Sequence, residues 1–172
     1  MQHTILKFDT IDSTQDEAKR IASFVETGTV IFAKRQRKGR GKPGNLWFSP
    51  DGGLYFSLIL KSDKDVNDLL FVTKSTAKVV VLVLLEYGLS AEIKLPNDVL
   101  VSGRKICGIL AEKTKEALII GVGVNLNTID FPVGLNATSI KLLAKDKIDP
   151  DEFLGRFLKI FDEKIENETG IK

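Results

Sequence analysis

The sequence of 172 residues contains one cysteine, one histidine and one tryptophan. Because Cys107 is the only thiol, the chain can form neither an internal disulfide nor a zinc site built from several cysteines. Its most apolar run, residues 79–85, is far shorter than the roughly 20 residues needed to cross a bilayer. The first residues lack the basic start and apolar stretch of a secretory signal. We therefore expect a soluble, cytoplasmic protein with no membrane partner.

The chain also has little net charge. Its 25 basic and 23 acidic residues give +2, and 43% of its residues are hydrophobic, a composition typical of one globular domain. This balance argues against a nucleic-acid-binding surface over the whole protein. It conceals a local basic cluster, because no acidic residue lies between Glu26 and Asp51. The cluster consists of Lys34, Arg35, Arg37, Lys38, Arg40 and Lys42.

Hydrophobic periodicity predicts an α+β domain, with a mixed, largely antiparallel sheet packed against helices. Helices are expected over residues 15–25, over 66–87 and in a terminal segment that opens at Asp149-Pro150-Asp151 and carries an apolar stripe from Phe153 to Ile165. Residues 66–87 contain a branched run that also suits a strand, but their length favours a buried helix. Strands are expected at Thr4–Phe8, Thr29–Ala33, Leu54–Leu60, Ala91–Leu95, Val99–Val101, Lys105–Glu112 and Ala117–Asn125.

A glycine loop, residues 39–53, begins within the basic cluster and contains its last two members, Arg40 and Lys42. Its segment Gly39-Arg-Gly-Lys-Pro-Gly44 matches the dinucleotide motif G-x-G-x-x-G, but that motif needs a helix to begin within the loop. Here two prolines interrupt and a strand follows, which excludes this reading; kinase and Walker motifs are absent as well. The positive charge of this loop has two interpretations that charge alone does not separate. It belongs either to a solvated loop or nucleic-acid patch, or to a site for a phosphate or carboxylate. The aromatic pair Trp47-Phe48 favours a ligand pocket.

A second polar segment, Lys94-Leu-Pro-Asn-Asp98, precedes a predicted hairpin with a two-residue turn at Ser102-Gly103. The hairpin places Asp98 roughly opposite Lys105, where a carboxylate would orient a nucleophile and an ammonium would stabilise negative charge. Taken alone, an exposed ion pair worth about 0–1 kcal/mol is the commoner case. Asn125 ends a predicted strand and Asn127 follows it. Their side chains suit either hydrogen bonds within a turn or hydrogen bonds to the edge of a nucleotide base.

These segments together resemble the biotin–protein ligases, which attach biotin to a lysine of a carrier protein. The resemblance covers about residues 5–165, and its motifs occur in the order of the family. The matching segments are Asp12-Ser13-Thr14-Gln15, Gln36-x-x-Gly39-Arg40-Gly41-x-x-Gly44-x-x-Trp47-Phe48-Ser49-Pro50, Lys94-x-Pro96-Asn97-Asp98, Arg104-Lys105-Ile-x-Gly108-Ile-Leu, Gly121-x-Gly123-x-Asn125-x-Asn127 and Ala137-Thr138-Ser139.

The resemblance implies a catalytic domain like that of class II aminoacyl-tRNA synthetases and biotin–lipoate ligases, and a reaction in two steps. The biotin carboxylate attacks the α-phosphorus of ATP, giving biotinyl-5′-adenylate and pyrophosphate. A lysine of biotin carboxyl carrier protein then attacks the mixed anhydride and releases AMP. Mg²⁺ arrives with ATP, and no fixed metal site is expected. No enzyme nucleophile is required, so catalysis rests on positioning and charge stabilisation.

The resemblance also implies roles for individual residues. Lys105, Arg40 and Asp98 are the expected catalytic residues, with Asp98 positioning the carrier lysine. The expected biotin-binding residues are Ser13, Thr14, Gln15, Gln36, Arg40, Gly41, Lys42, Lys105 and Gly108. The expected ATP or adenylate contacts are Arg40, Lys42, Trp47, Asn97, Lys105, Asn125 and Asn127.

The chain departs from the family pattern at Lys42-Pro43-Gly44-Asn45, where arginines are usual, and at Leu95, where tryptophan is usual. A lysine at position 42 keeps the charge but loses the bidentate contact of arginine. We expect residues 1–172 to form one catalytic domain, without a DNA-binding helix-turn-helix or a C-terminal SH3-like barrel. A homodimer remains open. The alternatives are a lipoate or octanoate ligase or transferase of the same fold, and a nucleic-acid-binding module.

Overall fold

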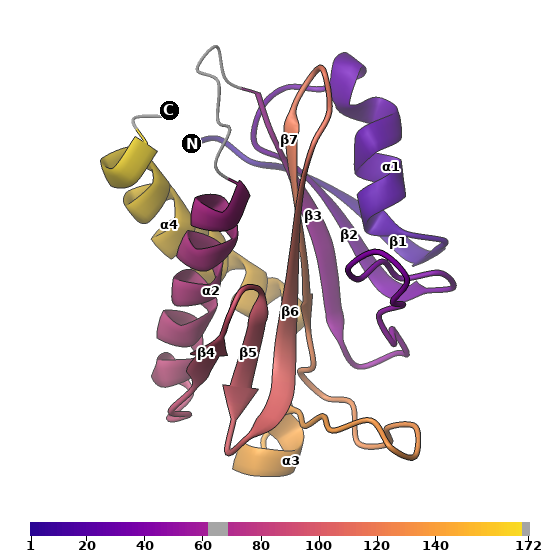
Figure 1. Cartoon of the computed structure of the whole chain (residues 1–172), viewed down its shortest axis with the longest axis vertical. Helices are drawn as coiled ribbons and strands as arrows, with labels where there is room; N and C mark the ends of the chain where they lie inside the picture. The colour runs from indigo at the N-terminus through magenta and orange to yellow at the C-terminus, as the bar shows by residue number, and fades with distance from the viewer. Residues whose placement is uncertain (62–68, 170–172) are drawn as a thin grey trace.

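The computed structural model describes residues 1–61 and 69–169, and within them seven strands form one sheet (Figure 1). The strand order is β1-β2-β3-β7-β6-β5-β4. The β1–β2 pair is parallel and the other neighbouring pairs are antiparallel. This confirms the predicted mixed, largely antiparallel sheet. The strands are β1 (Thr4–Ile11), β2 (Thr29–Gln36), β3 (Leu54–Leu60), β4 (Glu92–Lys94), β5 (Asp98–Val101), β6 (Arg104–Lys113) and β7 (Leu118–Val124).

Helices cover both faces of this sheet (Figure 1). They are α1 (Thr14–Ile21), continued by a 3₁₀ turn (Ala22–Phe24), then α2 (Leu69–Glu86), α3 (Ile140–Ala144) and α4 (Pro150–Thr169). On one face α1 packs against Ile31, Ile59 and Ile119. On the other face α2 and α4 lie side by side. The side chains of successive strand residues point to opposite faces, so β2 and β3 contribute to both layers.

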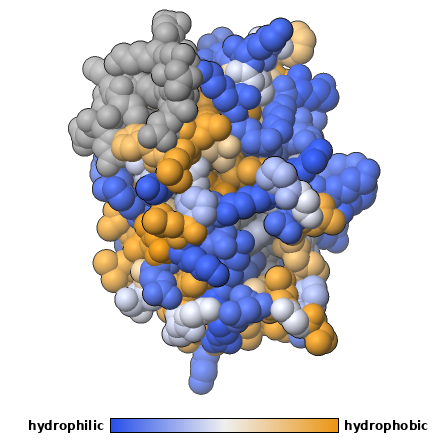
Figure 2. Space-filling view, viewed as in Figure 1, coloured by the Kyte–Doolittle hydropathy of each residue, from blue (hydrophilic) through white to orange (hydrophobic). Residues whose placement is uncertain are grey.

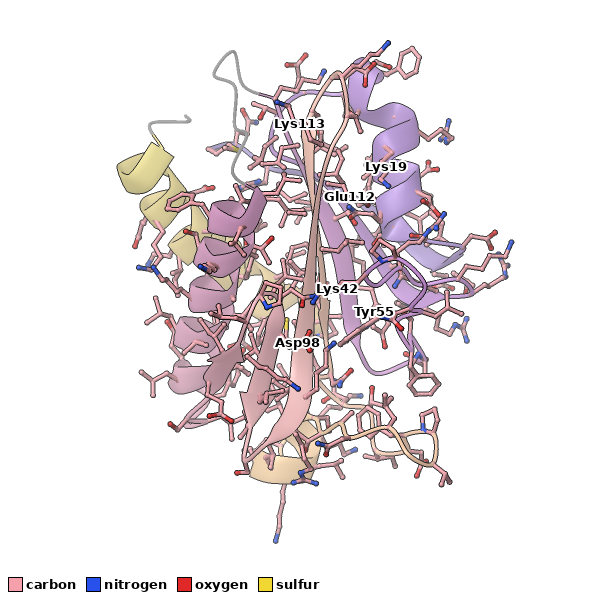
Figure 3. All side chains as sticks on the ribbon, in the orientation of Figure 1. Lys19, Lys42, Tyr55, Asp98, Glu112 and Lys113 are labelled. Atoms are coloured by element: carbon pink, nitrogen blue, oxygen red, sulfur yellow. The ribbon has the colours of Figure 1, made fainter. Side chains whose placement is uncertain are left out.

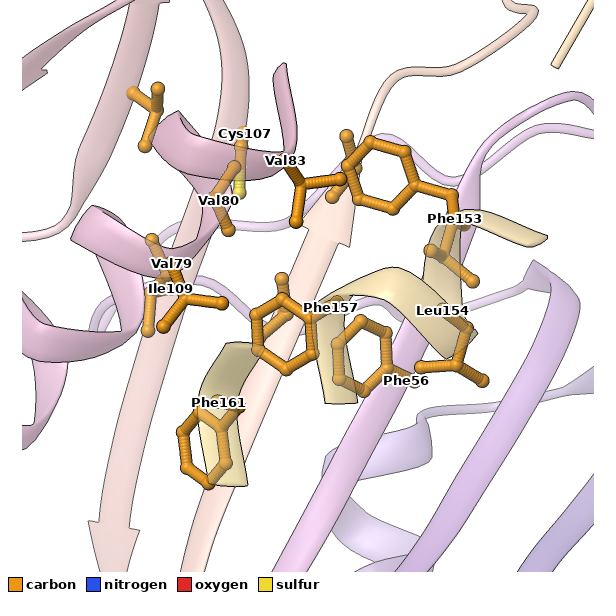
Figure 4. Packing of buried hydrophobic residues seen from close by; sticks show 14 of the residues in the cluster. Phe56, Val79, Val80, Val83, Cys107, Ile109, Phe153, Leu154, Phe157 and Phe161 are labelled. Atoms are coloured by element: carbon orange, nitrogen blue, oxygen red, sulfur yellow. The ribbon is translucent and has the colours of Figure 1, made fainter. Parts of the chain in front are cut away.

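The larger core lies between the sheet and the helices α2 and α4 (Figure 4). Phe157 of α4 stands edge-on to Phe56 of β3, with ring centroids 5.0 Å apart, and stacks on Phe161 at 5.5 Å. Helix α2 adds a set of buried valines, including Val80 and Val83. The burial of α2 between the sheet and α4 explains why its β-branched residues form a helix, because tertiary packing overrides weak local propensity.

The structure sets several element bounds differently from the sequence prediction. Strand β3 has the predicted bounds, whereas β2 extends to Gln36, so that Lys34 and Arg35 lie in a strand rather than in a loop. The short α3 was not predicted. The predicted start of the second helix at residues 66–68 lies outside the described residues, as does the side chain of Ile165 in the terminal stripe. No helix within the described ranges has the length and apolarity to cross a membrane.

Candidate active site

A cavity of about 340 Å³ lies where α1, the glycine loop and the strands β2, β3, β5, β6 and β7 meet. Most of the predicted site residues line it, although they come from segments far apart in the sequence. The residues of that set in the lining are Thr14, Gln15, Gln36, Arg40, Gly41, Lys42, Trp47, Asn97, Asp98, Lys105 and Gly108. Gly121 and Gly123 line the cavity too, so the fold brings together residues from five of the six matching segments.

Uncharged polar groups form one wall of this cavity. The carboxamide oxygen of Gln36 accepts hydrogen bonds from Thr14 N at 2.8 Å and from Thr14 Oγ1 at 3.1 Å. Ser57 Oγ lies 3.0 Å from both Thr14 Oγ1 and Gln15 Oε1. Thr14, Gln15 and Ser57 are at most 4% exposed. Buried polar groups arranged in this way recognise a polar part of a ligand rather than an alkyl chain.

Ser13, which the resemblance places against biotin, does not line the cavity in this structure. It is 1% exposed and caps α1, because its hydroxyl accepts a hydrogen bond from Asp16 N at 3.3 Å. This capping satisfies one of the free N–H groups at the helix start. Ser13 thereby fixes the position from which Thr14 and Gln15 enter the wall.

The glycine loop has more structure than its composition predicts. Arg40 and Leu46 form an antiparallel bridge, and Gly41 N donates to Asn45 O at 3.1 Å. Gly44 has φ +85°, a conformation that favours glycine. Arg40 Nε donates to Asp16 Oδ2 at 2.9 Å, and this hydrogen bond raises the pKa of Arg40. The loop is thus tied to α1 through one of its cations.

Trp47 lies flat against a pair of glycines in the sheet. Gly108 of β6 and Gly123 of β7 are directly opposite each other, and a Cβ added to them would lie 2.8 Å and 2.4 Å from the indole ring. Only glycine leaves room for this approach. The indole Nε1 is buried without a hydrogen-bond partner among the described residues. An unpaired buried donor beside a cavity suits a ligand acceptor.

Lys105 and Asp98 form an ion pair in the cavity, with Lys105 Nζ 2.8 Å from Asp98 Oδ1. The predicted proximity is confirmed, but the backbone register differs from the expected one. Lys105 is opposite Leu100, as the two-residue turn requires, and the register shift between Val99 and Leu100 places Asp98 opposite Gly108. The lysine side chain therefore reaches diagonally along the hairpin. The two side chains are 31% and 24% exposed, so a ligand can still reach them.

The asparagines of the predicted site have separate positions. Asn97 lines the cavity and its amide donates to Ile109 O at 3.1 Å. Asn125 and Asn127 lie outside the lining, and their side chains hydrogen-bond to backbone carbonyls. Asn125 Nδ2 donates to Thr138 O at 3.0 Å, and Asn127 Nδ2 donates to Ile148 O at 2.8 Å. Of the two uses that the sequence left open for these residues, the structure shows the one in which they fix turns.

Most of the basic cluster is paired with acids of β1, of the turn that follows it, or of α1. Lys34 Nζ lies 2.9 Å from Asp9 Oδ1, while Arg37 and Lys38 both contact Asp12 at 3.3 Å. The contacts of Lys38 and Arg37 lower the pKa of Asp12. Figure 2 shows that hydrophilic residues dominate the side of the molecule that carries α1.

Lys42 differs from these paired residues. Within the described residues it forms no ion pair and it lines the cavity. Figure 3 shows it above Asp98. Arg35 hydrogen-bonds Thr10 Oγ1 at 3.1 Å on the surface, so in the part of the chain that the structure describes Lys42 is the cluster residue that brings a positive charge without a paired acid to the cavity.

Sequence reasoning missed two residues of this region, Ser57 and Glu112. Ser57 is fully buried in a strand of otherwise apolar residues, Leu54–Leu60, and a lone hydroxyl in such a strand is a usable signal because it must find a partner. Glu112 contacts Gln15 from β6 at 2.8 Å. It gave no signal, because a glutamate near a strand end is usually a solvated residue.

Comparison with known proteins identifies the family of the chain. Residues 7–127 match the model of the biotin/lipoate A/B protein ligase family. The bifunctional ligase/repressor BirA of Bacillus subtilis is 36% identical over 175 residues, and the match covers 95% of this chain and 54% of BirA. The biotin–[acetyl-CoA-carboxylase] ligase of Paracoccus denitrificans is 30% identical over 161 residues, covering 83% and 65% of the two chains.

The fold comparison gives the same result. Biotin protein ligase from Aquifex aeolicus, solved in complex with biotin and ATP, superimposes with a TM-score of 0.87 at 33% identity over 95% of this chain and 71% of that chain. The present chain spans about half the length of the Bacillus relatives, 54% in each. The matched residues contain the glycine loop, the Asp98–Lys105 pair and the polar wall, and the chain belongs to the biotin/lipoate A/B protein ligase family.

Proposed function

We propose that this chain is a cytoplasmic biotin–protein ligase. It activates biotin with ATP to biotinyl-5′-AMP and transfers biotin to a lysine of a biotin carboxyl carrier protein. The observation that carries this proposal is one cavity with a polar, uncharged wall at Thr14 and Gln15 and with Arg40, Lys42 and Lys105 in its lining. The names of the relatives and the biotin and ATP bound in the Aquifex structure support the same function.

The two kinds of lining suit the two parts of biotinyl-adenylate. The polar wall would take the ureido head group, with Thr14, Gln15 and Gln36 as partners. The cations would take the biotin carboxylate and the phosphate that it attacks. Arg40 and Lys105 are the catalytic residues in this proposal, because their positive charge stabilises the negative charge that develops on the α-phosphate as the carboxylate attacks it and pyrophosphate leaves. Lys42, Gly41 and Gly108 would border the same anionic centre.

The second half-reaction needs an uncharged lysine of the carrier protein. The pKa of a free lysine is about 10.4, so the attacking amine must lose a proton near neutral pH. We assign Asp98 to this step, because it lines the cavity next to Lys105 and its carboxylate can orient an incoming ammonium. ATP is taken as its Mg²⁺ complex, so that ion belongs to the substrate and we assign it no protein ligand.

The position of Trp47 suits a role as a cover for the adenylate. Its ring is held against Gly108 and Gly123, and Lys105 Nζ lies 5.1 Å from the ring centroid. Asn97, in the lining, is the asparagine best placed for the nucleotide. Within this proposal residues 1–172 work as one catalytic domain, and DNA is not a partner.

The deciding experiment measures pyrophosphate release from ATP with biotin, lipoate or octanoate, followed by mass spectrometry of a biotin carboxyl carrier protein added to the mixture. We expect release with biotin and one modified lysine on the carrier. Turnover with lipoate or octanoate and none with biotin would move the chain to the other branch of its family. Tight binding of generic DNA at physiological salt would instead favour the nucleic-acid module.

A further inference from the structure

Glu112 lies on β6 outside the cavity lining, yet it contacts one of the residues in that lining. Its Oε2 accepts a hydrogen bond from Gln15 Nε2 at 2.8 Å, and its Oε1 lies 2.7 Å from Lys19 Nζ of α1 (Figure 3). An ionised carboxylate only accepts hydrogen bonds. The Gln15 carboxamide therefore faces Glu112 with its nitrogen, because the reversed amide would bring two acceptor oxygens together.

The remaining contacts of Gln15 support the same orientation. Its nitrogen also lies 3.4 Å from the carbonyl oxygens of Leu110 and Ile119, which are acceptors as well. Its oxygen accepts from Ser57 Oγ at 3.0 Å. Gly121 leaves space for that oxygen, since a Cβ there would lie 2.5 Å from it. Ser57 and Gly121 both line the cavity, so the carboxamide presents its oxygen on the cavity side.

The polar wall consequently has more acceptors than donors. The Ser57 hydroxyl has one hydrogen but lies 3.0 Å from two acceptors, Gln15 Oε1 and Thr14 Oγ1. The hydroxyl and backbone N–H of Thr14 are both directed to Gln36 Oε1, and Gln36 Nε2 donates to Ser49 Oγ at 2.9 Å. The wall therefore has acceptor capacity that its own hydrogens do not fill, and a ligand N–H would use it.

We propose that Glu112 is a positioning residue that makes this wall selective for a head group that donates N–H. The inference rests on the proposed function and deepens it, because the ureido ring of biotin carries two N–H donors. The dithiolane of lipoate and the chain of octanoate carry none. A site built to hydrogen-bond its substrate rejects an analogue that lacks the group far more strongly than a hydrophobic pocket does. Glu112 acts through Gln15 and does not touch the substrate.

The substitution Glu112→Gln tests this role with little change of shape. A glutamine at this position offers both an N–H₂ group and an oxygen, so the shortest contact of Gln15 no longer selects its nitrogen. Only the 3.4 Å contacts with Leu110 O and Ile119 O then favour the wild-type orientation. We expect KM for biotin to rise about tenfold, the effect of one lost hydrogen bond. KM for ATP and kcat should stay near wild type, and the rate with octanoate relative to biotin should increase.

Glu116→Gln is the matched control, because Glu116 is exposed at the turn of the same hairpin and its backbone N–H bonds to Thr114. It should leave the KM for biotin unchanged. Gly121→Ala is the second variant: it displaces the Gln15 oxygen from the opposite side and should also raise KM for biotin. If Glu112→Gln keeps the wild-type KM for biotin, or if it lowers kcat alone, the positioning role is wrong.

A binding measurement separates this inference from the proposed function. The probe is 2-imidazolidinone, a cyclic urea without a carboxylate, followed by ligand-detected NMR on the wild type and on Glu112→Gln. Wild-type binding that weakens in the variant supports the inference even if no adenylate forms. Adenylate formation with equal binding of the probe by both proteins leaves the function standing and overturns the inference. Absence of probe binding and of biotin turnover in the wild type overturns both.

Discussion

The ammonium of Lys105 lies 2.8 Å from Asp98 Oδ1 and 5.1 Å from the centroid of the Trp47 ring. This single side chain thus joins the hairpin, the glycine loop and the cavity. The contact with Asp98 has ion-pair distance, although Oδ1 is not aligned for a hydrogen bond. In the proposed reaction the biotin carboxylate and the α-phosphate would compete with Asp98 for this ammonium.

Replacing Lys105 with alanine should slow adenylate formation strongly. We expect pyrophosphate release to fall by about 10²–10³, the usual loss when one charge-stabilising group is removed. Stability should change little, because partly exposed ion pairs contribute about 0–1 kcal/mol. Urea denaturation measures this second effect. Lys115→Ala, at the exposed turn between β6 and β7, is the control and should behave as wild type. Wild-type kinetics in Lys105→Ala would refute the assignment.

Replacing Arg40 with glycine should release the adenylate. Arg40 ties the glycine loop to α1 through Asp16 at 2.9 Å, so its loss removes both a positive charge of the cavity and an anchor of the loop. We expect biotinyl-adenylate to form and then to be recovered in the filtrate after ultrafiltration of the enzyme. Arg37→Gly removes a guanidinium that pairs with Asp12 instead, and it should retain the intermediate. Equal retention by both variants would contradict the role of Arg40.

Local signals predicted the elements of this fold, and pairing between distant segments determined what they do. Ser102 and Gly103 have φ values of +50° and +72°, as a two-residue hairpin turn requires, and this turn was readable from the sequence. The sequence did not reveal the register shift between Val99 and Leu100, because nothing in the local pattern marks Ile106 as an extra residue in β6. Asp98 and Lys105 meet all the same, since a lysine side chain is long enough to span the offset.

The basic cluster shows the same limit. Its Lys34 is paired with Asp9 because β1 and β2 run parallel, which places Phe8 opposite Ala33 and Thr10 opposite Arg35. A parallel pair joined through a helix brings together residues about 25 positions apart. Counting charges along the sequence therefore does not reveal that Asp9 neutralises Lys34. Ser57 and Glu112 were missed for a related reason, since each acquires its meaning only from Gln15 on another element.

Cys107 should react with thiol reagents only when the protein unfolds. It is fully buried, and burial raises the pKa of its thiol, so the reactive thiolate is scarce at pH 8 in the native state. We expect native protein to react with Ellman's reagent slowly and urea-unfolded protein to react at once. Added biotin should slow the native reaction further, because a ligand of the folded state lowers the unfolded population. Fast labelling of the native protein would show that β6 opens locally.

Replacing Gly123 with alanine should displace the only tryptophan of the chain. The new Cβ would lie 2.4 Å from Trp47 Nε1, a distance at which the indole must move away from the sheet. We expect a red-shifted tryptophan emission, because the ring becomes more exposed, and about a tenfold or greater loss of adenylate formation. Fluorescence of Trp47 and pyrophosphate release measure the two effects on the same sample.

Gly155→Ala is the matched control for that substitution, because a Cβ at this exposed position of α4 meets nothing within 4 Å. It should leave emission and activity unchanged and raise the free energy of unfolding by about 0.5–1 kcal/mol, since glycine is unfavourable inside a helix. The combined variant Gly123→Ala/Trp47→Ala removes the clash as well as the indole. If its activity equals that of Gly123→Ala alone, the loss comes from the missing ring and not from a distorted sheet. A Gly123→Ala protein with wild-type emission and activity would show that Trp47 does not need the glycine pair.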